Sequence, residues 1–316
     1  MARVFFAVDV HGSTGVWKKW LSAPDFFKAD VLMLCGDLTG KALVPLVRQK
    51  DGSYNLAYWG MKFNLKTDKE IAEAEERLAN SGIYPFRSTP EEIEELKRNP
   101  DKVSRMMMEA VKNRIREWLD LALEKIDLKK IQVWAMPGND DFHEIDEVMK
   151  SYQDRGIAWL LDTVVEIAGI ETISLSYVNP TPWNTPREAT EPELAKMIDR
   201  LVGKLKDPRR SIFNFHCPPY GTKLDYAPEL DKNLKPITVG GAPQFIHVGS
   251  KAVLEAEKKY SPQLGLHGHI HESGATDHVG NAPVINPGSE YGEGVLRGVM
   301  IEASKEGISK YWKVEG

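Results

Sequence analysis

Five short, continuous runs of apolar residues constrain this 316-residue chain more than any other feature. Strands buried on both faces read as such runs, because neither side of the sheet meets water. Segments of helical character separate several of them, at Val16–Lys28, Glu191–Lys206 and Ser250–Tyr260. Strands and helices in alternation predict an α/β fold with a layered sheet. The five runs are Val4–Val8, Val31–Cys35, Ile131–Met136, Ile212–Phe215 and Leu264–Leu266.

Side chains that can bind metals follow each run. Ligands of open α/β sheets bind just beyond the carboxyl ends of the strands, so the five clusters should meet at one rim. Each cluster alone is a weak signal, because an Asp at a strand end is more often a turn or cap residue. Together they predict a metal site. The clusters are Asp9-Val10-His11-Gly12, Gly36-Asp37, Pro137-Gly138-Asn139-Asp140-Asp141, His216 and His267-Gly268-His269-Ile270-His271.

Residues 40–130 do not follow this alternation, and we interpret them as an insertion in a single domain of residues 1–316. The insertion opens with a hairpin pattern, in which a polar turn joins Leu43–Arg48 to Tyr54–Trp59. Near the other end of the chain, Val299–Glu302 and Ile308–Lys313 read as closing strands.

Helices follow the hairpin within the insertion. Two of them start at Thr-x-x-Glu capping boxes, Thr67 with Glu70 and Thr89 with Glu92. The longest should run from about Asp101 to Ile126, where apolar residues recur every three or four positions. We predict that this hairpin-plus-helix unit packs beside the metal rim and limits substrate size, or else forms a dimer contact.

Composition narrows the functional class. Hydrophobic residues make up 42% and charged residues 28%, as in ordinary soluble globular proteins. A net charge of -5 and a pI near 6.0 favour neither nucleic acid nor an anionic membrane as partner. The run Val4–Val8 is too short for a signal peptide or a membrane span. Cys35 and Cys217 do not make a disulfide framework, so we expect a cytoplasmic location and packing roles for both.

The ordered clusters resemble the pattern of the calcineurin-like metallophosphoesterase superfamily: D-x-H, G-D, G-N-x-[DE], a lone His and G-H-x-H. The resemblance spans Phe5 to His271. It implies a layered, metallophosphoesterase-type β-sandwich flanked by helices, with two metal ions at its rim. One ion would be held by Asp9, His11, Asp37 and His271. The second would be held by Asp37, Asn139, His216 and His269, with Asp37 bridging.

The mixture of carboxylate, imidazole and amide oxygen in this set suits Mn²⁺, Fe or Zn²⁺. We expect two divalent ions, Mn²⁺ first, with Fe, Zn²⁺ or Ni²⁺ as alternatives. Two such ions clamp the attacking and leaving oxygens of a phosphoryl displacement, and a bridging hydroxide would be the nucleophile. No protein nucleophile is then required.

The chain departs from the family pattern at the residue after Asn139. Many members have His there, which is thought to protonate the leaving group, whereas this chain has Asp140 and then Asp141. An unperturbed Asp has a pKa near 3.9 and carries almost no proton at neutral pH. The candidate catalytic residues are Asp140, Asp141 and His143. The alternative is that the two aspartates only anchor the loop that presents Asn139.

Four further features lie beside the motifs. His267 is either a partner of a metal ligand or a plain strand residue. The rigid segment 218–222 follows His216 and is a candidate wall of the substrate pocket. Lys41 and Tyr291 are candidate phosphate contacts.

These observations favour a metal-dependent phosphodiesterase that acts on a small or nucleotide-like substrate. A phosphomonoesterase of the same architecture, including a phosphoprotein phosphatase, is the alternative. A non-catalytic scaffold is disfavoured, because such scaffolds lose ligands and none is missing here. The acidic balance disfavours a nuclease. We expect no membrane partner, and a homo-oligomer formed through residues 40–130 remains open.

Overall fold

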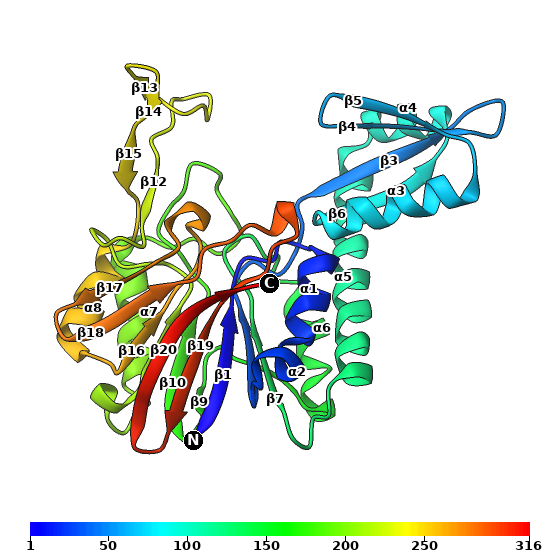
Figure 1. The fold of residues 1–316 in the computed structure, drawn as a ribbon. Coiled ribbons are helices and arrows are strands. Elements are labelled where there is room, and N and C mark those ends of the chain that lie inside the picture. The colour runs from blue at the N-terminus through cyan, green and yellow to red at the C-terminus, as the bar shows by residue number, and fades with distance from the viewer.

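The computed structural model describes all 316 residues and has two six-stranded mixed sheets at its centre (Figure 1). The first sheet has the order β20-β19-β1-β2-β7-β8, and the second β17-β18-β16-β11-β10-β9. The first comprises Gly307–Glu315, Arg297–Ser304, Ala2–Ala7, Val31–Cys35, Gln132–Met136 and Ile157–Trp159. The second comprises Ala275–Val279, Ala282–Asn286, Leu264–Leu266, Ile212–Phe215, Ile170–Leu175 and Val164–Ile167.

Successive side chains of β1 point to opposite faces of the sheet and enter two different cores. Val4 and Phe6 belong to the cluster packed between the two sheets, together with Ile212 and Leu264 of the second sheet. Phe5 faces the other way, into the cluster shared with the helices. Because both faces of the strand are buried, its sequence reads as an unbroken apolar run.

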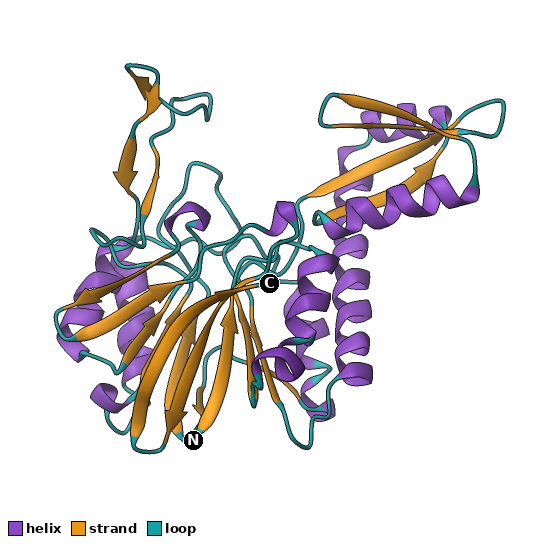
Figure 2. Ribbon diagram, viewed as in Figure 1, coloured by secondary structure: helices purple, strands orange, loops and turns teal.

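Helices cover the outer face of each sheet (Figure 2). The first sheet is covered by α1 (Thr14–Leu21), α5 (Pro100–Lys125) and α6 (Ile145–Lys150). The second is covered by α7 (Glu191–Val202) and α8 (Lys251–Tyr260). The predicted α/β fold, a layered β-sandwich flanked by helices, is confirmed. None of the helices combines the length and apolar character needed to cross a membrane.

One predicted helix is divided in two. The sequence suggested a single helix over Val16–Lys28, but α1 ends at Leu21 and α2 spans Ala23–Phe27. Pro24 lies in the first turn of α2, and its ring disfavours continuation of the preceding helix.

The insertion holds more strands than the sequence suggested. The predicted hairpin is present as β3 and β4, but β5 and β6 extend it into a four-stranded sheet of order β5-β4-β3-β6. β6 was missed because it pairs in parallel with the distant β3, a non-local contact with no local signature. Both capping boxes form at the predicted helix starts. The elements are Ala42–Arg48, Tyr54–Tyr58, Met61–Leu65 and Ile83–Ser88 for β3 to β6, then Asp68–Asn80 for α3 and Pro90–Arg98 for α4.

The insertion projects from one end of the sandwich, and α5 returns from it along the first sheet (Figure 1). Arg114 of α5 donates to the carbonyl of Gly12 at 3.1 Å, and Ser13 donates to the carbonyl of Asn80 at 2.5 Å. The insertion is therefore fixed to the loop that follows β1.

A second projection was not predicted. Strands β12 (Tyr226–Pro228) and β15 (Phe245–His247) pair at its base, and β13 (Thr238–Val239) and β14 (Ala242–Pro243) pair at its tip. It rises from the same end of the sandwich as the insertion (Figure 1).

Candidate metal centre

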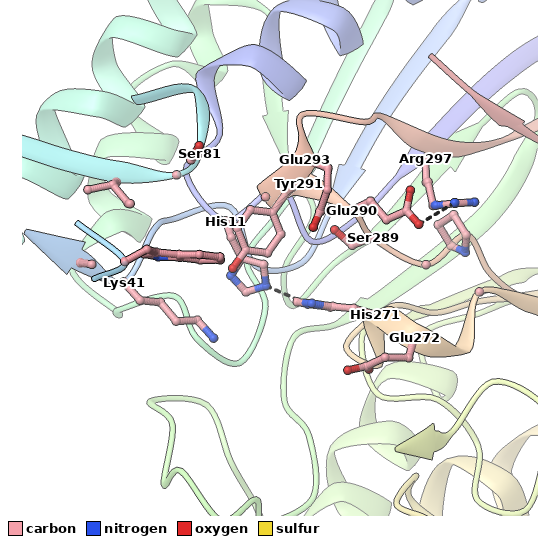
Figure 3. A pocket seen from close by; sticks show the side chains of 18 of the residues that line it. His11, Lys41, Ser81, His271, Glu272, Ser289, Glu290, Tyr291, Glu293 and Arg297 are labelled. Atoms are coloured by element: carbon pink, nitrogen blue, oxygen red, sulfur yellow. Dashed lines mark hydrogen bonds and ion pairs between the residues drawn. The ribbon is translucent and has the colours of Figure 1, made fainter. Parts of the chain in front are cut away.

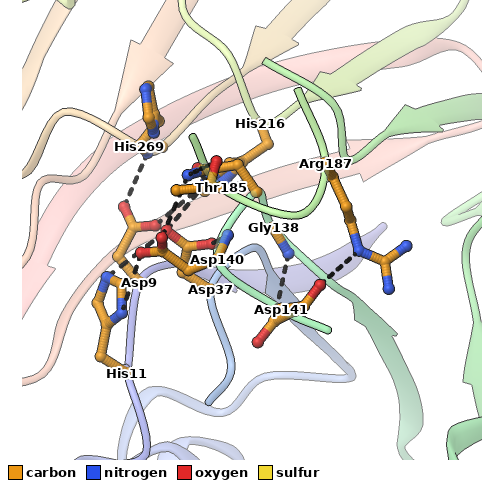
Figure 4. A network of polar contacts seen from close by, with 12 residues as sticks. Asp9, His11, Asp37, Gly138, Asp140, Asp141, Thr185, Arg187, His216 and His269 are labelled. Carbon is orange, nitrogen blue, oxygen red and sulfur yellow. Dashed lines mark hydrogen bonds and ion pairs between the residues drawn. The ribbon is translucent and has the colours of Figure 1, made fainter. Parts of the chain in front are cut away.

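The predicted ligands follow the carboxyl ends of strands in both sheets. Loops after β1, β2 and β7 present Asp9, Asp37 and Asn139, and loops after β11 and β16 present His216 and His269. These parallel strands of the two sheets end at the same edge of the sandwich, so the side chains meet there (Figure 4).

The side chains form two groups of potential ligands. One group is Asp9, His11, Asp37 and His271, and the other is Asp37, His216 and His269; within each group the ligand atoms lie within 4.8 Å of one another. Asn139 joins the second group, because its Oδ1 lies 3.1 Å from His216 Nε2. The structure thus brings together all seven residues, in the two sets that the resemblance implies, with Asp37 shared.

The backbone is strained at four of these positions. Asp9, His11, Asp37 and His269 have φ of 53°, 41°, 45° and 69°, in the left-handed region that residues other than glycine seldom adopt. Such conformations cost about 1–3 kcal/mol each and cluster at functional sites. The surrounding fold holds these four side chains where unstrained loops would not place them.

Two motif glycines allow the ligands to approach each other. A Cβ atom on Gly36 would lie 2.0 Å from His216 Nδ1, and one on Gly138 would lie 2.2 Å from Asp37 Oδ1. Real Cβ atoms do not tolerate such distances. Gly36 therefore lets the loops of the two sheets approach each other, and Gly138 lets two neighbouring loops of the first sheet do so.

Backbone N–H groups orient the two carboxylates. Asp140 donates to Asp37 Oδ1 at 2.9 Å, and His269 donates to Asp9 Oδ2 at 3.0 Å. Asp37 Oδ2 is left facing His216 Nε2 at 3.4 Å and His11 Nε2 at 3.6 Å. Asp9 Oδ1 is buried and has no hydrogen-bond partner. One oxygen of each carboxylate is thus fixed, and the other points into the centre of the cluster.

The Asn139 amide is oriented from the opposite side. Its Nδ2 donates to Thr185 Oγ1 at 3.1 Å, which turns Oδ1 toward His216. Glu188 accepts hydrogen bonds from the backbone N–H and hydroxyl groups of Thr181 and Thr185, and so holds the loop in place. Sequence reasoning missed this loop because it lies outside every motif.

Burial and neighbouring charges shift the pKa values of the side chains in the cluster. Burial, with the nearby Asp37 charge, raises the pKa of Asp9 to about 8. Burial also lowers the pKa of His269 to about 3 and that of His11 well below its usual range, so both imidazoles are neutral. For His216, burial is outweighed by Asp37 and Asp9, which raise its pKa to about 9.

Divalent cations would satisfy these groups. They would offset the buried carboxylates and occupy the lone pairs of the neutral imidazoles. Two carboxylates, four imidazoles and one amide oxygen form a donor set that suits transition-metal ions. The residues present therefore fit the ions that the sequence implies.

His267 lies behind this cluster. It is buried, and its Nδ1 donates to the backbone carbonyls of Phe215 and Cys217, at 2.9 and 3.0 Å. These carbonyls flank His216, so His267 fixes the loop that presents that ligand.

Comparison with known proteins gave one curated relative and several solved structures. "Uncharacterized protein MJ1162" of Methanocaldococcus jannaschii is 32% identical over 162 residues, which cover 50% of this chain and 64% of the relative. The match thus spans less than two thirds of that relative's length. No family model matches the chain.

One solved structure aligns with 99% of this chain and 98% of its own, with a TM-score of 0.55 and 17% identity. TT1561 of Thermus thermophilus aligns over the same shares at a TM-score of 0.49 and 13% identity. An archaeal phosphodiesterase aligns over 99% of both chains, with a TM-score of 0.34 and 12% identity. Only the first of these scores indicates a shared architecture, and at 17% identity it concerns the fold alone.

The motif order, the paired mixed sheets and the convergence of the ligands at the strand ends agree with what the resemblance implies. The chain has the layered β-sandwich fold, flanked by helices, that this resemblance implies. Within this fold, the candidate metal centre is open to solvent on the side of His269 and His271, which are only partly buried.

Asp140 is the catalytic candidate that faces the candidate metal centre. Its carboxylate forms an ion pair with Lys41, and its Oδ2 lies 3.8 Å from His11 Nδ1. Burial and the Asp37 charge raise the pKa of Asp140 to about 7. The pKa of Asp140 thus lies above the value near 3.9 of an unperturbed Asp.

Asp141 and His143 do not face the cluster. Asp141 is buried, and its carboxylate accepts hydrogen bonds from the backbone N–H groups of Leu38, Thr39 and Gly138, at 2.9, 2.9 and 2.8 Å. This carboxylate anchors the two loops that present Asp37 and Asn139. His143 is exposed, with Nε2 3.2 Å from the carbonyl of Pro186, and no hydrogen bond or ion pair joins it to a candidate ligand.

A cleft of about 860 Å³ opens from the metal centre (Figure 3). His11 and His271 line it together with Lys41 and Tyr291, the two candidate phosphate contacts. One wall comes from the insertion and the other from the loop after β18. The volume is typical of small-molecule sites. The insertion thus lies beside the metal centre. Its wall residues are Ala42, Tyr58, Trp59, Met61, Ser81, Gly82 and Ile83.

Proposed function

We propose that this chain is a calcineurin-like metallophosphoesterase that hydrolyses a small phosphodiester with two divalent cations. The observation that carries the proposal is the pair of ligand groups that share Asp37. When bound, the two cations would activate a water molecule and polarise the phosphoryl group. Mn²⁺ is the first candidate, and Fe, Zn²⁺ or Ni²⁺ suit the same donors.

The protein's own contribution begins with Lys41. Its ammonium group lies at the cleft beside Asp140. Burial opposes the positive charge, but Asp140 and, to a smaller extent, Asp37 outweigh it and raise the pKa of Lys41. A fixed positive charge there would stabilise the negative charge that develops on the phosphoryl oxygens. We assign Asp140 the role of positioning Lys41, because the ion pair holds the flexible side chain over the site.

The charge of the cleft lining does not separate a diester from a monoester. Its three acidic residues, Glu272, Glu290 and Glu293, are matched by Lys41, Arg297 and Lys313. The choice of a diester therefore depends on the leaving group.

The absence of a placed general acid favours a diester with an activated leaving group. His143 is turned away, and Asp140 is engaged with Lys41, so neither is placed as a free general acid. We expect the rate to depend steeply on the pKa of the leaving group.

Hydrolysis of bis-p-nitrophenyl phosphate and of mono-p-nitrophenyl phosphate tests the proposal. The Mn²⁺-loaded protein should hydrolyse the diester faster, and exhaustive chelation should abolish both activities. Faster turnover of the monoester would identify a phosphomonoesterase instead. If the loaded protein hydrolysed neither, the chain would be a scaffold and the proposal would be wrong.

A further inference from the structure

The β4–β5 hairpin of the insertion presents an aromatic side chain to the cleft. Tyr58 pairs with Met61, which leaves Trp59 and Gly60 as a two-residue turn. Both turn residues have positive φ, 49° and 74°, as in a type I′ turn. Asn and Gly suit the first of these positions, whereas a bulky residue there is strained.

Trp59 is strained and also exposed. Its side chain is 83% exposed, although it lines the cleft that contains His11 and His271. A tryptophan seldom leaves so much apolar surface in water without a partner. An exposed indole on a strained turn, in the cleft of the metal centre, is explained by a ligand that covers it.

The chemistry of the cleft indicates what this ligand carries. The metal centre would bind the phosphoryl group, and the organic group attached to it would extend along the cleft wall. Trp59 offers a flat face, and the Tyr58 ring lies 5.6 Å from it, centroid to centroid. Stacking on such a face suits any planar base and does not depend on its hydrogen-bonding edge.

We propose that Trp59 is a specificity-determining residue that stacks on the nucleobase of a nucleotide-type phosphodiester substrate. The inference rests on the proposed function, because it takes the metal centre as the phosphate site. It narrows the substrate class to nucleotides, and it assigns their selection to a residue outside every metal motif.

Calorimetric binding of adenosine 5′-monophosphate and ribose 5-phosphate to the Mn²⁺-loaded protein tests this proposal. The two ligands share the phosphate and the sugar, so their affinities differ only through the base. Trp59→Ala should weaken binding of the nucleotide roughly 5- to 140-fold, the range for losing one stacked base, and leave ribose 5-phosphate unchanged. Trp59→Phe should restore most of the affinity.

Phe26→Ala is the matched control, because Phe26 is 79% exposed on α2 and does not line the cleft. It should change neither affinity. Equal loss of both ligands in Trp59→Ala, unchanged nucleotide affinity, or no nucleotide binding by the unsubstituted protein would overturn the proposal. Dissociation of an oligomer by Trp59→Ala, with no selective loss of the nucleotide, would make Trp59 an interface residue.

The outcome is separable from that of the proposed function. If Trp59→Ala lost only nucleotide affinity but the parent protein did not hydrolyse the diester, the stacking site would stand and the proposed hydrolase function would be wrong. If the parent protein hydrolysed the diester but Trp59→Ala did not change nucleotide affinity, the hydrolase function would stand and the stacking site would be wrong.

Discussion

The Nε2 atoms of His11 and His271 lie 2.9 Å apart, although the two residues are separated by 260 positions in the sequence. Burial lowers the pKa of both rings, so both are neutral near pH 7. Asp37 Oδ2 lies 3.6 Å from the same nitrogen of His11. Two neutral imidazole nitrogens and a carboxylate oxygen that face one point are what a single cation requires.

Lys41 should be needed for turnover. Lys41→Met should lower kcat for the diester about 10²-fold, because it removes a positive charge that faces the phosphoryl oxygens. Lys41→Arg should retain part of the activity. Steady-state kinetics would measure both, with Lys62→Met, on an exposed part of the β4–β5 hairpin outside the cleft, as control. Unchanged kinetics in Lys41→Met would remove Lys41 from the mechanism.

Asp141 should matter for folding rather than for chemistry. Asp141→Ala leaves three backbone N–H groups without their acceptor, and should lower the free energy of unfolding by about 3 kcal/mol or more. Urea unfolding measures this loss, with the exposed Asp101→Ala as control. A variant as stable as the parent, metal-loaded and yet inactive, would point instead to a catalytic role.

The lowered pKa of Glu188 should make the stability of the fold depend on pH. Burial opposes its ionisation, but hydrogen bonds from Thr181 and Thr185 lower its pKa below the ordinary 4.5. A carboxyl group whose folded pKa is depressed stabilises the fold fully above its unfolded pKa, and this contribution is lost as pH falls through the folded pKa. Glu188→Gln should therefore cost about 1–3 kcal/mol at neutral pH, and less as the pH falls below 4.5.

Urea unfolding of the parent and of Glu188→Gln, at neutral pH and below the ordinary Glu pKa, measures this difference. Glu255→Gln is the control, since Glu255 lies on the surface of α8 and pairs only with Lys258. A difference between parent and Glu188→Gln that is constant with pH would show that the carboxylate charge contributes nothing.

The sequence predicted the strands that carry the site, because strands buried on both faces have a local signature. Val31–Cys35, Ile212–Phe215 and Leu264–Leu266 have the predicted bounds. The starts of α3 and α4 were predicted for a similar reason, since each capping box is a contact between residues three positions apart. Local patterns were sufficient for these elements.

Features that depend on distant contacts were not predictable from the sequence. The pairing of β6 with β3 and the loop that holds Asn139 through Thr185 join segments far apart in the chain. The raised pKa of Asp140 arises from burial and from Asp37, which a residue-by-residue pattern does not contain. The exposure of Trp59 was not predictable either, because a tryptophan at the end of a predicted strand is normally expected to be buried.

The presence of two cations that share Asp37 is the central claim, and anomalous diffraction from crystals soaked in Mn²⁺ tests it most directly. Metal content per chain, measured in solution, would accompany it. We expect two peaks flanking Asp37 in the parent protein and in His143→Ala, and neither peak in Asp37→Ala, because that change removes a ligand of both ions. No peak at this rim in the parent protein, or two peaks that survive Asp37→Ala, would contradict the claim.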